Sequence, residues 1–156
     1  MTDQRISVIP DLIDALVELS RESLPYAGIT VSDGQPLEWE VGDWLYVGVT
    51  DADSATPTPA GTAEQIWPLA TATGRDENGT VTCVAYVLRP EAVMKDARDA
   101  AFAIVGVVQD VLRLDTRLGI PGMKRTSFTG LDFDQGQTQD GALAIVTFRI
   151  EFSARI

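Results

Sequence analysis

The sequence predicts an α+β protein in which a mostly antiparallel or mixed sheet packs against a long central helix and a shorter N-terminal helix. Three patterns indicate this class: an apolar helical repeat over residues 90–119, several segments in which alternate residues are apolar, and an amphipathic helical repeat over residues 9–24. The chain has 156 residues, the size of one domain that can bury a core without disulfides. We therefore expect a single domain over residues 1–156.

The central helix is the most apolar part of the chain, with no polar residue between Ala100 and Val108. We expect Pro90 to form its first turn and Gly119 with Pro121 to end it. A helix that is apolar nearly all round its middle must be covered on more than one side. Two neighbouring stripes make up the apolar surface: Ala97, Ala101, Ile104, Val108 and Val111 in the first, and Val93, Ala100, Val107 and Leu114 in the second.

The N-terminal helix, residues 9–24, has a single apolar face and ends before Pro25. Two strands, residues 43–49 and 80–88, carry apolar residues on both faces, which is typical of strands buried on two sides. In the first of these strands, Leu45, Val47 and Val49 are expected on one face, and Trp44 and Tyr46 on the other.

The connecting segments are predicted from turn residues and composition. Residues 28–34 are predicted to form a short strand, and residues 65–72 are predicted to form an edge strand. Residues 50–64 carry no large apolar side chain and are expected to form a mobile loop. The sequence Asp-Glu-Asn-Gly at 76–79 is typical of a hairpin turn.

The C-terminal part is expected to be a hairpin of residues 124–133 and 142–156 around a polar tip, residues 134–141. Apolar and polar residues alternate along the last strand, so its register is well fixed.

The predicted strands have more apolar surface than one layer of helices can cover. Either the two helices cover opposite faces of the sheet, or a neighbouring subunit covers part of it, and we favour the neighbouring subunit. Trp44, Tyr46 and Tyr86 are accordingly candidate interface residues.

Composition excludes several classes of function. The chain has no histidine and one cysteine, Cys83, which we expect to be a small buried hydrophobe. The net charge of −11 argues against nucleic-acid binding by counterion release. No glycine-rich phosphate loop, signal peptide or membrane span is apparent. We expect no catalytic residue, cofactor or metal, and no membrane association.

Paired carboxylates are the common enzyme chemistry that remains open. Asp51 with Asp53, and Asp132 with Asp134, could bind a hard cation or act as acid and base. A small carboxylate-dependent enzyme or a cation-binding module is therefore a competing hypothesis. Both pairs lie in predicted loops, where acidic residues are common because they are solvated.

A series of short landmarks, in a fixed order, carries a family resemblance. The chain resembles the tail terminator, or tail completion, proteins of long-tailed siphophages, especially those of phages that infect actinobacteria. The landmarks follow the N-terminal helix: Val-Ser-Asp-Gly-Gln-Pro at 31–36, Asp-Trp-Leu-Tyr-Val-Gly at 43–48, Thr-Cys-Val at 82–84, Val-Leu-Arg-Leu-Asp at 111–115, Leu-Gly at 118–119, and Gly-Ala at 141–142.

The resemblance implies a small, non-enzymatic α+β protein of the virion. Such proteins form a ring, typically a hexamer, at the head-proximal end of the tail. The ring ends polymerisation of the tail-tube protein and provides the docking surface for the head–tail connector, or neck, protein. The resemblance thus implies production in the host cytoplasm, assembly with copies of itself, and passage of DNA through the bore without specific binding. We expect part of the acidic charge to line that bore and repel DNA.

The polar segments of the chain are candidates for contacts above and below such a ring. These are Asp51 and Asp53 in the loop 50–64, and Asp134, Gln137 and Asp140 in the tip 134–141. Lys124 and Arg125, the only adjacent basic pair, are candidates for contact with an acidic partner surface.

The small acidic α+β character would also suit a neck or head-completion protein or a tail-tube subunit of a phage. A monomeric binding module of another class is a further hypothesis. Such a module would have to hide the second apolar face within one chain.

Overall fold

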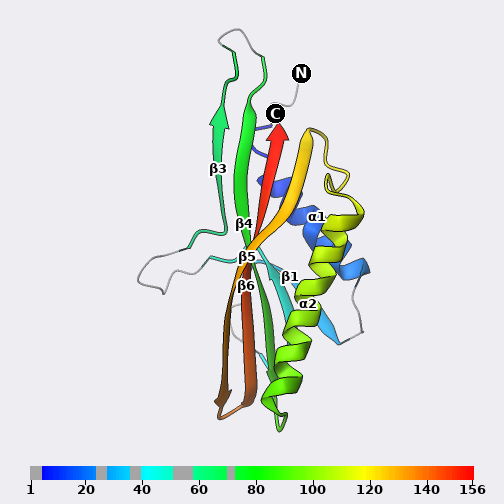
Figure 1. The fold of residues 1–156 in the computed structure, drawn as a ribbon, viewed down its shortest axis with the longest axis vertical. Coiled ribbons are helices and arrows are strands. Elements are labelled where there is room, and N and C mark those ends of the chain that lie inside the picture. Colours follow the sequence, from blue (N-terminus) through cyan, green and yellow to red (C-terminus); the bar gives the residue numbers. More distant parts are fainter. Residues whose placement is uncertain (1–4, 24–27, 36–39, 51–57, 70–72) are drawn as a thin grey trace.

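The computed structural model describes residues 5–23, 28–35, 40–50, 58–69 and 73–156 and has the predicted α+β class (Figure 1). Two helices and six strands follow in the order α1 (Ile9–Glu22), β1 (Ile29–Asp33), β2 (Gly42–Val47), β3 (Gly61–Ile66), β4 (Asp76–Arg89), α2 (Met94–Leu114), β5 (Met123–Thr138) and β6 (Gly141–Arg155).

The strands form one mixed sheet in the order β1-β2-β4-β6-β5, and β3 also pairs with β4. Only β1 and β2 are parallel among these pairs. The long strand β4 pairs with β6 over its whole length, whereas β3 pairs with its first half and β2 with its second half. Strands β4, β5 and β6 run along the long axis of the molecule (Figure 1).

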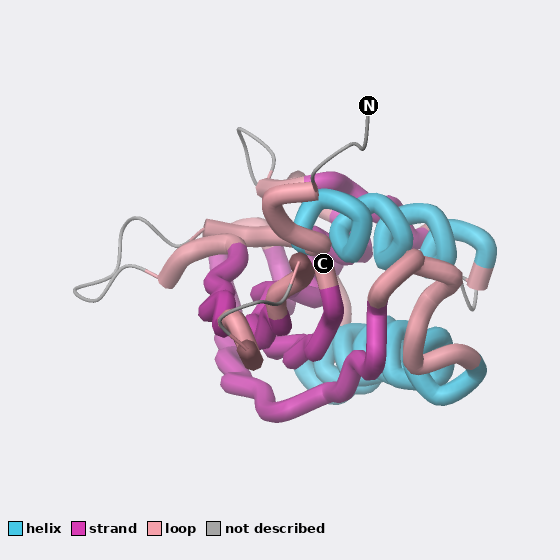
Figure 2. Tube along the Cα trace, turned by 90° about the horizontal axis from the view of Figure 1, so that it is seen from above, coloured by secondary structure: helices cyan, strands magenta, loops and turns pink. Residues whose placement is uncertain are grey.

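Both helices pack on the same face of the sheet, so an arrangement with the helices on opposite faces is wrong. One core contains side chains of α1 and α2 together with the residues of β4 and β6 that face them, and Figure 2 shows both helices beside the curled sheet. The predicted alternation of β6 is confirmed, because its apolar row is buried in this core. That row consists of Val146, Phe148, Ile150, Phe152 and Ala154.

The second face of the sheet holds a smaller apolar core, which we call the aromatic cluster: Tyr46, Val49, Val84, Tyr86 and Leu88, with Trp44, Leu143 and Ile145 packed against it. Strands β2 and β4 are thus apolar on both faces, as predicted. The aromatic cluster is buried within a single chain, however, with Tyr46 at 0% exposure. The chain therefore buries this cluster without a neighbouring subunit, and contact of the sheet with such a subunit stays a prediction. Val49 belongs to this cluster and not with Leu45, because β2 ends at Val47 and Gly48 has a φ of 75°.

Helix α2 begins four residues later than predicted, at Met94. Glu91 has a φ of 56°, so Pro90 belongs to a turn and not to the helix. The first predicted stripe is buried, but the second is not: Leu114 is 87% exposed and Val93 is also exposed. Within the chain, α2 is therefore covered mainly on the side that faces the sheet.

The predicted hairpin turn at residues 76–79 is wrong, because Asn78 and Gly79 lie within β4. A Cβ atom at Gly79 would lie 2.1 Å from the carbonyl oxygen of Thr62 and 2.7 Å from the Phe152 ring. This glycine permits close packing of strands rather than a reversal of the chain.

Two loop predictions also need correction. Residues 61–64 belong to β3 and not to a loop, whereas 51–57 lie outside the described residues, as do 70–72 at the end of the predicted strand 65–72. The tip predicted at residues 134–141 is shorter, because β5 stays paired with β6 as far as Thr138 and only residues 139–140 form the turn.

Glu77 is fully buried and joins α1 to the sheet. Val8, the N-cap residue of α1, has no side-chain cap; its backbone N–H donates to Oε1 of Glu77 at 2.8 Å. The Ser7 hydroxyl donates to the same oxygen at 3.1 Å, and the Gln65 amide donates to Oε2 at 2.6 Å. A carboxylate from β4 thus satisfies a free N–H at the start of α1.

Cys83 is buried in β4, as expected. Burial raises the pKa of its thiol to about 12, and a hydrogen bond with the Gly48 backbone opposes this shift. Because the thiolate is the reactive form, we expect a maleimide at neutral pH to label the native protein at least about 100-fold more slowly than the urea-unfolded chain. Equal labelling rates, measured by mass spectrometry, would contradict this burial.

Candidate interaction surfaces

The predicted contact residues separate into two groups at opposite ends of β5. Lys124 and Arg125 lie at its start, whereas Asp134, Gln137 and Asp140 lie at or beside the β5–β6 turn. A strand of 16 residues spans about 50 Å, so the two groups cannot form one site within a chain. Figure 1 shows these ends at the top and the bottom of the molecule.

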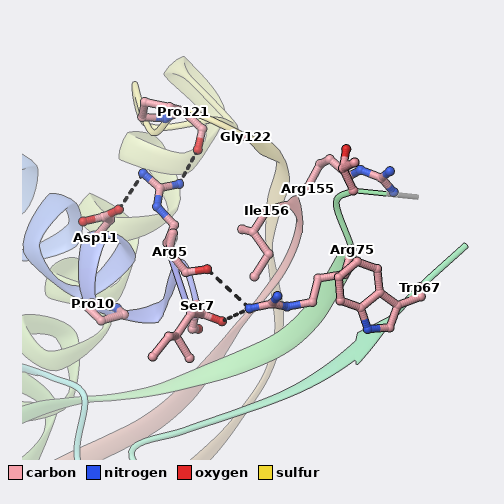
Figure 3. Close-up of a pocket in the computed structure, with 12 residues that line it drawn as sticks. Arg5, Ser7, Pro10, Asp11, Trp67, Arg75, Pro121, Gly122, Arg155 and Ile156 are labelled. Atoms are coloured by element: carbon pink, nitrogen blue, oxygen red, sulfur yellow. Dashed lines mark hydrogen bonds and ion pairs between the residues drawn. The ribbon is translucent and has the colours of Figure 1, made fainter. Parts of the chain in front are cut away.

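At the upper end, beside both termini of the described chain, the surface is hollowed (Figure 3). We call this feature the terminal hollow; it has a volume of about 950 Å³, and its lining includes Arg5, Ile6, Trp67, Arg75, Arg155 and Ile156.

Hydrogen bonds hold the arginines of the terminal hollow in place. Arg5 forms an ion pair with Asp11 at 2.9 Å and donates to the carbonyl of Pro121. Arg75 donates to the Gln65 amide oxygen at 2.8 Å and to the carbonyl of Ile6 at 3.2 Å. The guanidinium of Arg75 also lies 5.7 Å from the centre of the Trp67 ring, within the range of a cation–π interaction.

Large apolar side chains are exposed around the same end of the molecule. Ile6 is 78% exposed and Trp67 is 55% exposed, and both line the terminal hollow. Ile66 and Leu69, which lie close to Trp67 in the chain, are also exposed. Aromatic and arginine side chains next to apolar surface are the composition expected at the centre of a protein interface.

Lys124 extends the basic surface at this end. The pairing of β5 with β6 shifts between Met123 and Arg125, which leaves Lys124 and Arg125 both exposed. The Lys124 ammonium lies 3.0 Å from the Asp76 carboxylate, and Arg155 lies 3.2 Å from the same oxygen. These hydrogen bonds, with that from Lys124 the larger effect, lower the pKa of Asp76.

The opposite end carries the acidic tip, which we define as residues 134–140. Asp134, Gln137 and Asp140 are all exposed there, as predicted for contact residues, but most of this segment is paired strand and not loop. Just before the tip, Asp132 forms an ion pair with Arg149 at 3.1 Å.

The aromatic candidates Trp44, Tyr46 and Tyr86 do not form an exposed surface. Their rings contact one another, with 5.7 Å between the centres of Trp44 and Tyr46 and 6.2 Å between those of Tyr46 and Tyr86. Tyr46 and Tyr86 are buried and Trp44 is half-buried. All three pack in the second core; Tyr46 and Tyr86 are not exposed as interface anchors in this conformation, whereas Trp44 keeps part of its surface exposed.

Burial raises the pKa of Tyr46 above its ordinary value of 10.0, with smaller contributions from Tyr86 and Glu40. Ionisation is therefore easier in the unfolded chain, so the stability from this group is complete below pH 10 and falls as the pH rises further. We expect the free energy of unfolding, measured in urea, to drop between pH 8 and about pH 11. The drop should be smaller in Tyr46→Phe; an unchanged pH dependence would contradict the assignment.

The carboxylate pairs gain no support as a cation site. Asp51 and Asp53 lie outside the described residues. Asp132 is paired with Arg149. Over the ranges that the structure describes, no cluster of three or more cysteine, aspartate or glutamate side chains is placed to hold a metal ion.

Sequence patterns do not reveal most of the terminal hollow. Arg75 lies 70 residues after Arg5, and Arg155 lies 80 residues after Arg75, so no local pattern connects the three arginines. Trp67 is predicted in an edge strand, but it follows the last residue of β3. The pairing of β3, β4 and β6 brings these residues to one end of the sheet.

The chain matches no protein-family model, and comparison with the curated proteins likewise gave no match. No helix in the described part of the chain is long and apolar enough to cross a membrane.

Proposed function

We propose that this protein is a structural component of a phage virion, a tail terminator that forms a ring on the head-proximal end of the tail tube. The ring would end tube polymerisation and present a surface to the head–tail connector, and DNA would pass through its bore without specific binding. The landmarks of the sequence resemble this family, and the α+β fold agrees with what the resemblance implies.

The observation that carries the proposal is the terminal hollow. Exposed Ile6 and Trp67 beside Arg75 combine apolar area with cationic groups, as interface centres do. A partly cationic, apolar surface at one end of an otherwise acidic protein is typical of a docking site for another protein chain. A terminator needs docking surfaces for its own copies, for the tube and for the connector.

The test is capping of tail tubes. Purified protein is added to polymerising tail-tube protein, and tube length and tube ends are recorded by electron microscopy. We expect the protein alone to form no long tubes, and its addition to shorten tubes by placing one ring at one end. Long tubes formed by the protein alone would identify a tube subunit instead, and unchanged tubes without bound protein would exclude the terminator function.

A monomeric binding module is the second candidate, and burial of the aromatic cluster within one chain favours it. In that case, light scattering gives the mass of one chain at every concentration, and tail-tube protein does not change it. The capping experiment then also fails, which separates the two candidates.

A further inference from the structure

The terminal hollow and the acidic tip are complementary surfaces of the same chain. We propose that the terminal hollow of one copy receives the acidic tip of the next copy, and that this is the contact between neighbouring subunits. The inference rests on the proposed ring-forming function, since it names the surfaces through which the ring would close.

Charge complementarity is the first observation in favour of this contact. The terminal hollow and its rim carry the cationic groups of Arg5, Arg75, Arg155 and Lys124. Asp11 and Asp76 share ion pairs with three of these groups, whereas Arg75 pairs with neutral oxygens and an aromatic ring. The tip offers the exposed carboxylates of Asp134 and Asp140.

The net negative charge of the chain favours a partner surface of opposite charge. Each copy has a formal charge of −11, so two copies repel one another unless a basic surface of one meets an acidic surface of the other. Opposite potentials fix the register of an interface and exclude wrong pairings. A contact between hollow and tip satisfies this condition with surfaces that every copy carries.

Shape supports the same pairing. The tip narrows to a two-residue turn between paired strands, with Thr138 opposite Gly141. Two paired strands are only about 5 Å apart, so a hairpin end is a narrow, rigid insert. The hollow of about 950 Å³ is large enough for several side chains, and Trp67 and Ile6 give it apolar walls that would exclude water from the ion pairs.

The positions of the two surfaces make the contact heterologous. They lie at opposite ends of β5, about 50 Å apart, so a tip cannot reach the hollow of its own chain. Each copy then contributes its acidic tip to one neighbour and its terminal hollow to the other. Repeating such a contact produces a ring if the rotation closes and an open filament if it does not.

Two charge-reversed variants test the proposal, namely a hollow variant, R75E/R155E, and a tip variant, D134K/D140K. We expect wild-type mass, measured by light scattering, to rise with concentration beyond a dimer. Each variant alone should associate at least about 100-fold more weakly, because like charges meet at the contact. Mixed in equal amounts, the two variants should assemble beyond a dimer again, because the intact tip of one meets the intact hollow of the other, and the reversed hollow meets the reversed tip with opposite charges.

Control measurements separate loss of the proposed contact from misfolding and from a change in the overall charge of the chain. Association of the mixture requires both variants to be folded, and circular dichroism of each variant checks this independently. R113E/R117E alters arginines near the same end but outside the hollow, and D14K/E18K alters acidic residues of α1. Both controls should associate like the wild type. A quadruple variant that carries both reversals should regain association.

Several results would overturn the inference: a wild type that stays monomeric at the highest concentration, either variant assembling like the wild type, or a mixture that contains only monomers. These outcomes can be distinguished from failure of the proposed terminator function. A wild type that assembles through hollow and tip but does not cap tubes removes the terminator function and keeps the contact. Capping that persists in both variants removes the contact and keeps the function.

Discussion

Replacement of Glu77 by alanine is expected to lower the free energy of unfolding by about 3 to 5 kcal/mol. The carboxylate of this fully buried residue accepts hydrogen bonds from Ser7, from the Val8 backbone and from Gln65. Truncation would leave the buried Val8 N–H without its acceptor and would also remove the acceptor of the partly buried bonds from Ser7 and Gln65. Urea unfolding of Glu77→Ala followed by circular dichroism measures the loss.

Two further variants make this result specific. Glu77→Gln keeps one acceptor oxygen, so it should lower the free energy of unfolding by less, about 1 to 2 kcal/mol. Glu64→Ala removes an exposed carboxylate from the neighbouring strand β3 and should change stability by less than about 0.5 kcal/mol. If Glu77→Ala were as stable as Glu64→Ala, the buried hydrogen bonds would not hold α1 to the sheet.

Gly79→Ala is expected to destabilise the protein by about 3 kcal/mol, although a single methyl group is added. The new Cβ would meet the Thr62 carbonyl oxygen at 2.1 Å and the Phe152 ring at 2.7 Å. Thr62 belongs to β3 and Phe152 to β6, so either the edge strand or a core ring must move. Thermal unfolding of the variant measures the effect.

Gly106→Ala is the matched control for this change, because, apart from the adjacent residues and the nearby backbone of α2 itself, no atom lies within 4 Å of the Cβ that it would add. Gly106 lies inside α2, where alanine is favoured over glycine by about 1 kcal/mol. The same chemical change should therefore raise stability in the helix and lower it in the strand. A loss of stability in both variants would show that the close packing around Gly79 is not the cause.

The sequence predicts a helix or strand correctly where burial of one of its faces determines the local structure. Leu45 and Tyr46 point to opposite faces of β2, and each belongs to a separate core, as the alternation predicts. Prediction fails where a distant chain segment overrides the local preference. Asn78-Gly79 is a strong turn signal, yet β3 and β6 pair on both sides of it and hold it extended.

The same limit applies to the candidate surfaces. Asp134 and Asp140 can be found from sequence because they lie before and within a single turn that local residues specify. The terminal hollow cannot, because Arg5 comes before α1, Arg75 before β4, and Arg155 ends β6. Likewise, the alternation identifies the aromatic residues of β2 and β4, but it does not reveal that one chain covers them on its own.

Strand β4 pairs with three other strands, and this has a consequence for the order of folding. Its main partner, β6, lies more than 50 residues further along the chain, and their register runs from Asp76 opposite Arg155 to Arg89 opposite Ala142. Contacts of such long range slow folding, because the chain loses loop entropy before they form. The β5–β6 hairpin, closed by two residues, can form early, whereas β2 and β3 gain a stable neighbour only once β4 has joined that hairpin. We therefore expect the first 89 residues to stay incompletely folded and open to chaperones during synthesis until β6 has left the ribosome.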